Sequence, residues 1–209
     1  MFNHIFYNGK ILDVIALFFS SIQKDTEMPP ISKTFKDRVV EAASIFIKKE
    51  GGNINYMKLV KLLYLADRLS IEENEVPITY DNFSAMPMGM VVSTTLDLAK
   101  NNKTISQWNE SFETKNFFVS IKGEYPRLKK LCIEDVEILE KIYSKYGKLD
   151  QFQLAEITER VPEWKDPNGS SFPVEVKDLL LSMGKSEEDS ERIESQILEN
   201  SKLDSFFEK

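Results

Sequence analysis

The sequence predicts a mainly α-helical fold, a single compact domain with one short β-hairpin around residues 112–122. Three observations support this fold class. Several segments carry apolar residues at every third or fourth position, the spacing that places side chains on one face of a helix. Helix-capping residues and glycine stops bound many of these segments. The length of 209 residues, with 42% hydrophobic and 29% charged residues, suits one globular domain.

The first two helices are predicted close together in the sequence. Periodic apolar residues indicate a helix over residues 34–50, and the Gly51-Gly52 pair is typical of its end. Asn55 is a favourable N-cap for the next helix, which extends to about Ile71. Because this second helix is apolar on two faces, we expect it to pack at the centre of the domain.

The middle of the chain mixes irregular and short regular segments. Pro87 and Gly89 exclude a regular helix over residues 80–90. A short helix is expected over residues 91–100. The aromatic residues that follow indicate the hairpin at 112–122.

The last third of the chain is helical and acidic. Residues 150–209 hold seven basic and fifteen acidic residues, a net charge of −8, whereas residues 1–149 sum to +1. This asymmetry indicates either a solvated acidic tail or a surface that faces a basic partner. Four helices are predicted, over residues 134–146, 151–160, 172–183 and 186–198.

Three regions follow from these patterns. We expect an N-terminal extension over residues 1–30, a helical domain over 31–183 and an acidic C-terminal helix or tail over 184–209. The apolar run at residues 14–19 is too short to cross a bilayer, so no membrane association is expected. Either translation starts at Met28, or the extension forms a short helix that packs on the domain or on a partner.

Catalysis is not expected of this chain. The single histidine, His4, lies near a terminus, and the single cysteine, Cys132, has apolar neighbours that place it in the core. One His and one Cys cannot form a common zinc site, and no nucleotide-binding or metalloprotease motif is present. We therefore expect no enzyme, no cofactor and no metal. The lone cysteine favours a cytoplasmic location, and the net charge of −7 makes nucleic acid an improbable partner.

Three segments, in order, share the motifs of one family. Residues 57–67 read MKLVKLLYLAD, residues 81–91 read DNFSAMPMGMV, and residues 146–164 contain YGKL followed by TERVPEW. Together they resemble the Panacea domain, also called the SocA-like or phage-associated-protein domain. The resemblance covers roughly residues 34–170.

The resemblance implies a mostly helical domain that acts as an antitoxin and neutralises a toxin by direct contact. It also implies that some members deliver the toxin to a protease, and it implies no catalytic residues. The chain departs from the family pattern at Met86, where Trp is usual, at Met90, where Pro is usual, and at Glu159, where His is usual. A divergent member with another role is therefore an alternative.

The candidate partner-binding residues allow two interpretations. In the first, Tyr64 packs in the core and Lys61 reaches a carboxylate or a loop carbonyl. In the second, these two residues belong to a binding patch in which Trp164 is an anchor. Methionines at alternate positions suit a binding surface and a core gap equally well. The complete patch would consist of Lys61, Tyr64, Met86, Met88, Gly89, Glu159 and Trp164.

The sequence thus predicts an antitoxin-like protein whose partner is a cognate protein toxin, basic if it meets the acidic helices. One alternative is a proteolytic adaptor that also binds a protease. Another is a nucleic-acid-binding regulator, since Lys58, Lys61 and Arg68 form a narrow basic strip on the second helix.

Overall fold

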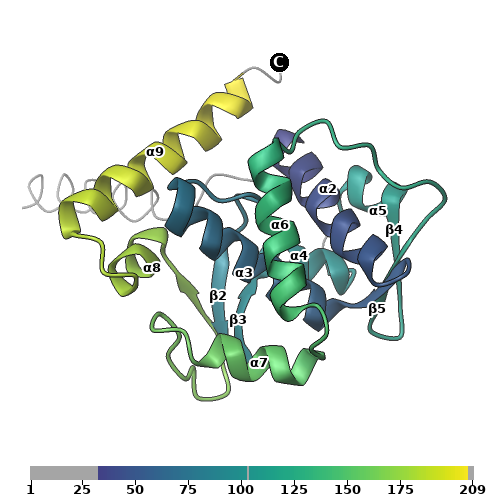
Figure 1. Ribbon diagram of the computed structural model, residues 1–209, viewed down its shortest axis with the longest axis horizontal. Coiled ribbons are helices and arrows are strands. Elements are labelled where there is room, and N and C mark those ends of the chain that lie inside the picture. The colour runs from purple at the N-terminus through teal and green to yellow at the C-terminus, as the bar shows by residue number, and fades with distance from the viewer. Residues whose placement is uncertain (1–32, 103, 207–209) are drawn as a thin grey trace, which may run out of the picture. The chain divides into compact units, whose positions relative to one another are not determined.

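The computed structural model describes residues 33–102 and 104–206 (Figure 1). The expected extension over residues 1–30, including the alternative start at Met28, lies outside the described residues. The elements follow in the order α2 (Lys33–Lys49), β1 (Asn53–Asn55), α3 (Tyr56–Asn74), β2 (Phe83–Met86), β3 (Gly89–Val92), α4 (Ser93–Ala99), α5 (Ser106–Ser111), β4 (Phe112–Lys115), β5 (Phe118–Ile121), α6 (Ile133–Tyr146), α7 (Gln151–Glu159), β6 (Phe172–Val174), α8 (Val176–Ser182) and α9 (Glu187–Phe206).

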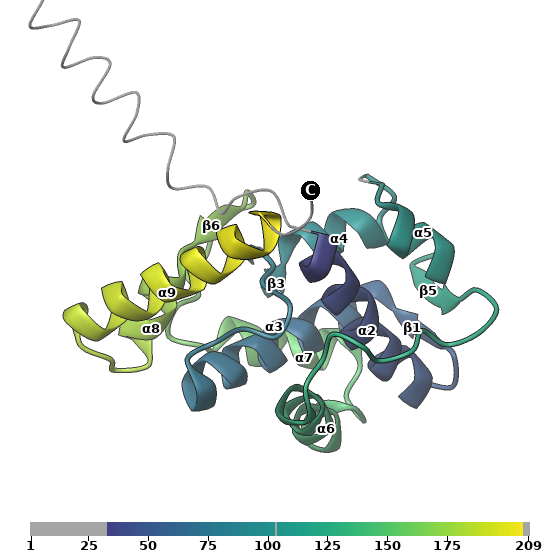
Figure 2. The ribbon, with the colours of Figure 1, turned by 90° about the horizontal axis from the view of Figure 1, so that it is seen from above.

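Helix α3 lies at the centre of the fold, as its two apolar faces predicted (Figure 2). It packs against α2, α4, α6, α7 and β3. Leu59 and Leu63 on one face of it and Tyr64 on the second face are fully buried. Asn55 caps it as expected, because its Oδ1 accepts the backbone N–H of Met57 at 2.9 Å.

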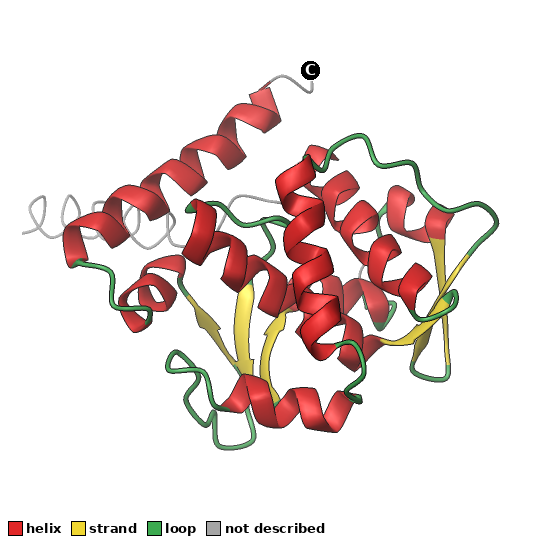
Figure 3. Ribbon diagram, viewed as in Figure 1, coloured by secondary structure: helices red, strands yellow, loops and turns green. Residues whose placement is uncertain are grey.

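The predicted mainly helical fold is confirmed, but it contains two small antiparallel sheets where one hairpin was expected (Figure 3). The hairpin at 112–122 is confirmed as β4 and β5, and β1 extends it in the order β1-β5-β4. The second sheet has the order β3-β2-β6. Its strands β2 and β3 form a hairpin in the segment around residues 80–90, where Pro87 and Gly89 were predicted to prevent a helix.

Two helix boundaries in the last third were predicted wrongly. Helix α9 continues to Phe206, beyond the predicted end at residue 198, and the helix predicted from residue 172 begins later. Residues 172–174 form the edge strand β6 rather than the start of a helix, and α8 begins only at Val176. Pro173 lacks an N–H but pairs with Ser84 at a sheet edge, where the missing donor is tolerated. The Ser84 hydroxyl also donates to the Phe172 carbonyl at 3.1 Å.

Cys132 was expected in the core and is exposed. It is the N-cap residue of α6, and its backbone N–H donates to Asp135 Oδ2 at 2.8 Å. A residue just ahead of a helix does not share the helix's inward face, so its apolar neighbours misled the prediction.

Helix α9 places its apolar residues inward and its acids outward. Ile193 and Ile197 are buried in the core, and α9 packs mainly against α8. The acidic C-terminal residues therefore lie on a packed helix. No helix within residues 33–102 and 104–206 has the length and apolar character needed to cross a membrane.

Candidate functional site

Pro87 and Met88 form the turn between β2 and β3, and we call these two residues together with Gly89, the first residue of β3, the hairpin tip. The hairpin tip lies between α3 and α7. Its backbone is held by Lys61 of α3, whose Nζ donates to the Met88 carbonyl and, at 3.4 Å, to the Met90 carbonyl. A buried side chain thus fixes the path of a surface turn.

Lys61 is fully buried, and its three hydrogen bonds are to neutral oxygen atoms. Its third donor reaches Thr158 Oγ1 of α7 at 3.2 Å, so all three ammonium hydrogens have acceptors. Among the described residues, Lys61 takes part in no ion pair within 4.0 Å. Burial lowers its pKa to about 8, and the nearby charge of Glu159 opposes that shift.

Gly89 allows the hairpin tip to approach α7 closely. Its φ of 88° lies in the left-handed region that favours glycine. A Cβ at this position would lie 2.2 Å from Thr158 Oγ1 and 3.0 Å from the Ala155 carbonyl oxygen. Both the backbone conformation and the contact with α7 therefore require glycine.

Trp164 holds the other side of the hairpin. Its indole Nε1 donates to the Met86 carbonyl at 3.0 Å, and its ring is partly buried against the core. Trp164 therefore holds the hairpin in place, and its side chain remains partly exposed.

A buried carboxylate joins α3 to the segments that follow α7. Glu163 Oε1 accepts hydrogen bonds from the Tyr64 hydroxyl and, at 2.8 Å, from Arg68 Nε. Its Oε2 accepts the Ser182 hydroxyl at 2.9 Å. Burial alone would raise the pKa of Glu163, but the hydrogen bonds from Arg68 and Tyr64 hold it below its ordinary value. Burial and the charge of Glu163 raise the pKa of Tyr64.

Two further buried carboxylates fix the loop that leads into β2. Asp67 accepts the Thr79 backbone N–H at 2.8 Å and also the Thr79 hydroxyl. Asp81 accepts the backbone N–H groups of Thr94 at 3.0 Å and Thr95 at 2.8 Å, which lie in the first turn of α4. Both ends of the β2–β3 hairpin are therefore anchored by buried side chains.

The buried position of Asp67 makes the stability of the fold depend on pH. Burial raises its pKa from 3.8 to about 7, so the folded chain binds more protons than the unfolded chain between those values. The contribution of Asp67 to the free energy of unfolding therefore falls as pH rises from about 4 to 7. Asp67→Asn resembles the protonated acid, and we expect it to remove this dependence.

Denaturant unfolding of wild type and Asp67→Asn across this pH range measures the effect. The stability advantage of the variant should grow from acidic to neutral pH. Asp166→Asn, at an exposed turn position, is the control and should follow wild type throughout. A difference between wild type and Asp67→Asn that stays constant with pH would contradict the assignment.

The structure brings the seven predicted site residues into one region but distributes them between interior and surface. Lys61, Tyr64 and Gly89 are buried, Met86, Glu159 and Trp164 are partly exposed, and Met88 is 38% exposed. The interpretation in which Lys61 reaches a loop carbonyl agrees with its contacts. The three methionines do not share one side, because the turn separates exposed Met88 from fully buried Met90.

Sequence reasoning missed three polar residues of this region, Asp67, Thr158 and Glu163. Asp67 closes the first family motif, and its place beside the buried face of α3 was the available signal. Thr158 and Glu163 lie in the third family segment, but their neighbours in the sequence do not mark them as buried.

These features define a class of protein, a mainly helical domain that presents a turn with a rigidly held backbone. A family model for the antitoxin SocA-like, Panacea domain matches residues 59–165, which is more than half of the chain. The chain belongs to this SocA-like Panacea family. The matched range includes Lys61, the hairpin tip, Thr158 and Trp164. No curated protein and no solved structure gives a match.

Proposed function

We propose that this protein is an antitoxin that neutralises a toxin by direct binding, with the hairpin tip as part of the contact surface. The family match over residues 59–165 is the observation that carries the proposal. The buried anchors of the hairpin tip lie within that range. A turn that is rigid before binding loses little conformational entropy when a partner docks, which favours affinity.

The surface around the hairpin tip has the composition of a protein contact. Met88 is exposed at its centre, and the partly exposed Met86 and Trp164 lie beside it. Methionine and tryptophan are enriched in the buried centres of protein interfaces. Glu159 adds one acidic side chain. Lys61, Tyr64 and Gly89 contribute indirectly, because they set the position of the turn.

A toxicity rescue tests the proposal. The small open reading frame next to this gene is expressed under tight induction, with and without this protein. We expect growth arrest in its absence and growth in its presence, with a complex recovered from the rescued cells. A harmless neighbour that also fails to bind would overturn the proposal. Loss of the toxin from rescued cells, without a complex, would favour a proteolytic adaptor.

Substitution of Met88 tests the contact surface. Met88→Glu places a charge at the centre of the proposed interface, and we expect it to weaken toxin binding at least about a hundredfold. Phe117→Glu is the matched control, because Phe117 is 67% exposed in the turn between β4 and β5, at the tip of the other hairpin. Affinities measured by calorimetry or interferometry decide the point. Equal affinity for wild type and Met88→Glu would remove the hairpin tip from the interface.

The acidic face of α9 is a second proposed contact, for a toxin with a basic surface. Deletion of α9 would not test it, because Ile193 and Ile197 would be lost from the core. The double change Glu188→Lys and Glu199→Lys alters only exposed positions. We expect it to slow toxin association about tenfold at low salt and less at high salt. An unchanged association rate would show that the acidic face of α9 is not part of the interface.

A further inference from the structure

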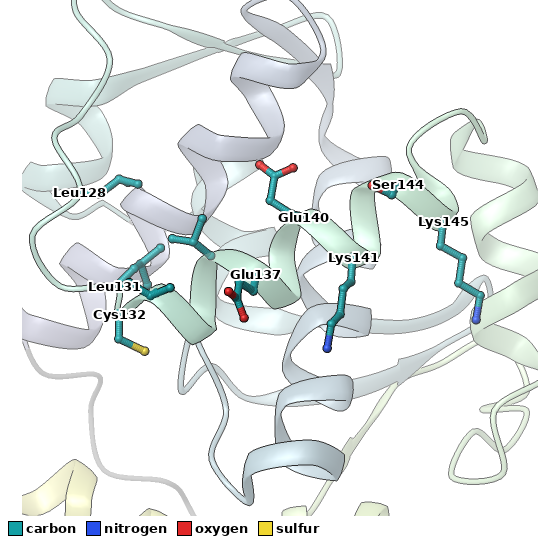
Figure 4. Close-up of a pocket in the computed structure, with 10 residues that line it drawn as sticks. Leu128, Leu131, Cys132, Glu137, Glu140, Lys141, Ser144 and Lys145 are labelled. Carbon is teal, nitrogen blue, oxygen red and sulfur yellow. The ribbon is translucent and has the colours of Figure 1, made fainter.

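A shallow groove of about 950 Å³ runs along α6, on a part of the molecule separate from the hairpin tip (Figure 4). Its apolar end is formed by Leu128 and Leu131 of the loop before α6, together with Ile133. Glu137 and Lys141 point to the same side of α6 farther along the groove.

The loop that forms the apolar end of the groove is fixed from beneath. The buried Glu41 carboxylate accepts three consecutive backbone N–H groups, those of Lys129 at 2.9 Å, Lys130 at 2.9 Å and Leu131 at 3.1 Å. Arg38 Nη1 donates to the Lys130 carbonyl at 2.7 Å. The groove is therefore preformed.

The exposed apolar side chains of the groove are concentrated at one end. Ile133 is 74% exposed and Leu128 is 46% exposed. Single exposed apolar residues are common on protein surfaces, but adjacent ones that line one groove are typical of interaction sites.

Charges divide the outer face of α6 into two halves. Glu134, Glu137 and Glu140 are exposed from its start to its middle, and Lys141, Lys145 and Lys148 are exposed from there to just beyond its end. Within the chain, Glu140 pairs with Lys49 at 2.5 Å and Lys141 pairs with Glu73 at 2.8 Å. This order suits the dipole of any single helix. The dipole gives no reason, however, for the exposed Ile133 and Leu128. A second α6 laid antiparallel on the first would cover them and pair the acidic half of each helix with the basic half of the other.

We propose that two copies of this chain associate through this groove, with their α6 helices antiparallel about a two-fold axis. Such an interface presents the same patch from both copies. A two-fold axis at the level of Leu139, whose own side chain is buried, brings Glu137 to the level of Lys141 of the second copy, because both lie equally far along the helix from that residue. Lys141 would then exchange its exposed partner Glu73 for Glu137 of the second copy. It also places Ile133 across from Lys145, whose methylene groups can cover the isoleucine while the ammonium stays in water.

The apolar part of this interface is tested with the full chain by sedimentation velocity over a wide range of concentrations. Wild type is expected to form a dimer, and Ile133→Glu is expected to weaken it at least about a hundredfold. Ile133 is largely exposed, so the substitution should leave the fold intact, as circular dichroism will verify. Met88→Glu, outside the groove, should dimerise like wild type. A wild type that stays monomeric throughout, or a dimer unaffected by Ile133→Glu, overturns the proposal.

Charge reversal tests the antiparallel geometry. Glu137→Lys or Lys141→Glu alone places like charges across the axis, and each should weaken the dimer about tenfold. The two changes combined exchange the charges and should restore the wild-type dissociation constant to within about threefold. Single changes without effect, or a double variant as weak as the single ones, would contradict the pairing. These readouts do not involve a toxin, so they are independent of the proposed antitoxin function.

Discussion

Lys61→Met is expected to lower the free energy of unfolding by about 3 kcal/mol, because it removes three hydrogen bonds from a fully buried site. The carbonyls of Met88 and Met90 would keep their burial but lose their donor. Methionine nearly preserves the volume of lysine, so the cost reports mainly the polar contacts. Denaturant unfolding at neutral pH measures it, and Lys48→Met at an exposed position of α2 should stay within about 0.5 kcal/mol of wild type.

The free energies of unfolding of wild type and Lys61→Met should also respond differently to alkaline pH. The pKa of Lys61 falls from 10.5 in the unfolded chain to about 8 in the folded chain, so the unfolded chain binds more protons between those values. The contribution of Lys61 to stability therefore rises as pH rises from about 8 to 10.5. Wild type should gain stability relative to Lys61→Met across this window. A constant difference would show that Lys61 titrates normally in the folded chain.

Gly89→Ala is expected to be the most destabilising small substitution in the hairpin, with a cost of about 4 kcal/mol. The added Cβ would overlap Thr158 Oγ1 and press on the Ala155 carbonyl of α7, in a backbone conformation that already disfavours alanine. The hairpin tip would have to move away from α7. Toxin rescue should be lost at temperatures where the variant is still folded.

Gly169→Ala is the matched control for this prediction. Gly169 has a φ of 82°, close to that of Gly89, but no atom lies within 4 Å of its added Cβ. It therefore shares only the backbone strain, which costs about 1 kcal/mol. The difference between the two variants in denaturant unfolding isolates the contact with α7. Equal losses in the free energy of unfolding for the two variants would mean that the contact of Gly89 with α7 does not restrict the side chain at this position.

Much of the fold could be predicted from the sequence because helix signals are local. The two apolar faces of α3 and the cap at Asn55 are visible in a short stretch of residues, and the structure contains both. The sheet β3-β2-β6 was not predictable in this way, because β2 pairs with residues 172–174 from a distant part of the chain. Pro173 strengthened the error, since its place in an edge strand is apparent only when its partner is known.

The sequence identified which residues belong to the candidate site better than it identified what each residue does there. The family motifs and the helical spacing of Lys61 and Tyr64 identified residues that do lie together. The motifs did not show which of these residues are buried. The acceptors of Lys61 come from distant parts of the chain, so its sequence neighbours do not distinguish it from a lysine on the surface. Thr158 and Glu163 escaped notice for the same reason, and their partners are assembled only by the packing of α3 against α7 and α8.

The hairpin tip separates the residues that determine its shape from those that a partner would touch. From inside, Lys61 binds the Met88 carbonyl and Trp164 binds the Met86 carbonyl just before the tip, whereas the Met88 side chain faces outward. Exchange of an exposed side chain on such a turn changes stability by only about 0.5 kcal/mol. New recognition surfaces can therefore evolve on this scaffold one outward residue at a time, while the backbone that displays them stays the same. A domain built this way can change partners without first changing its fold.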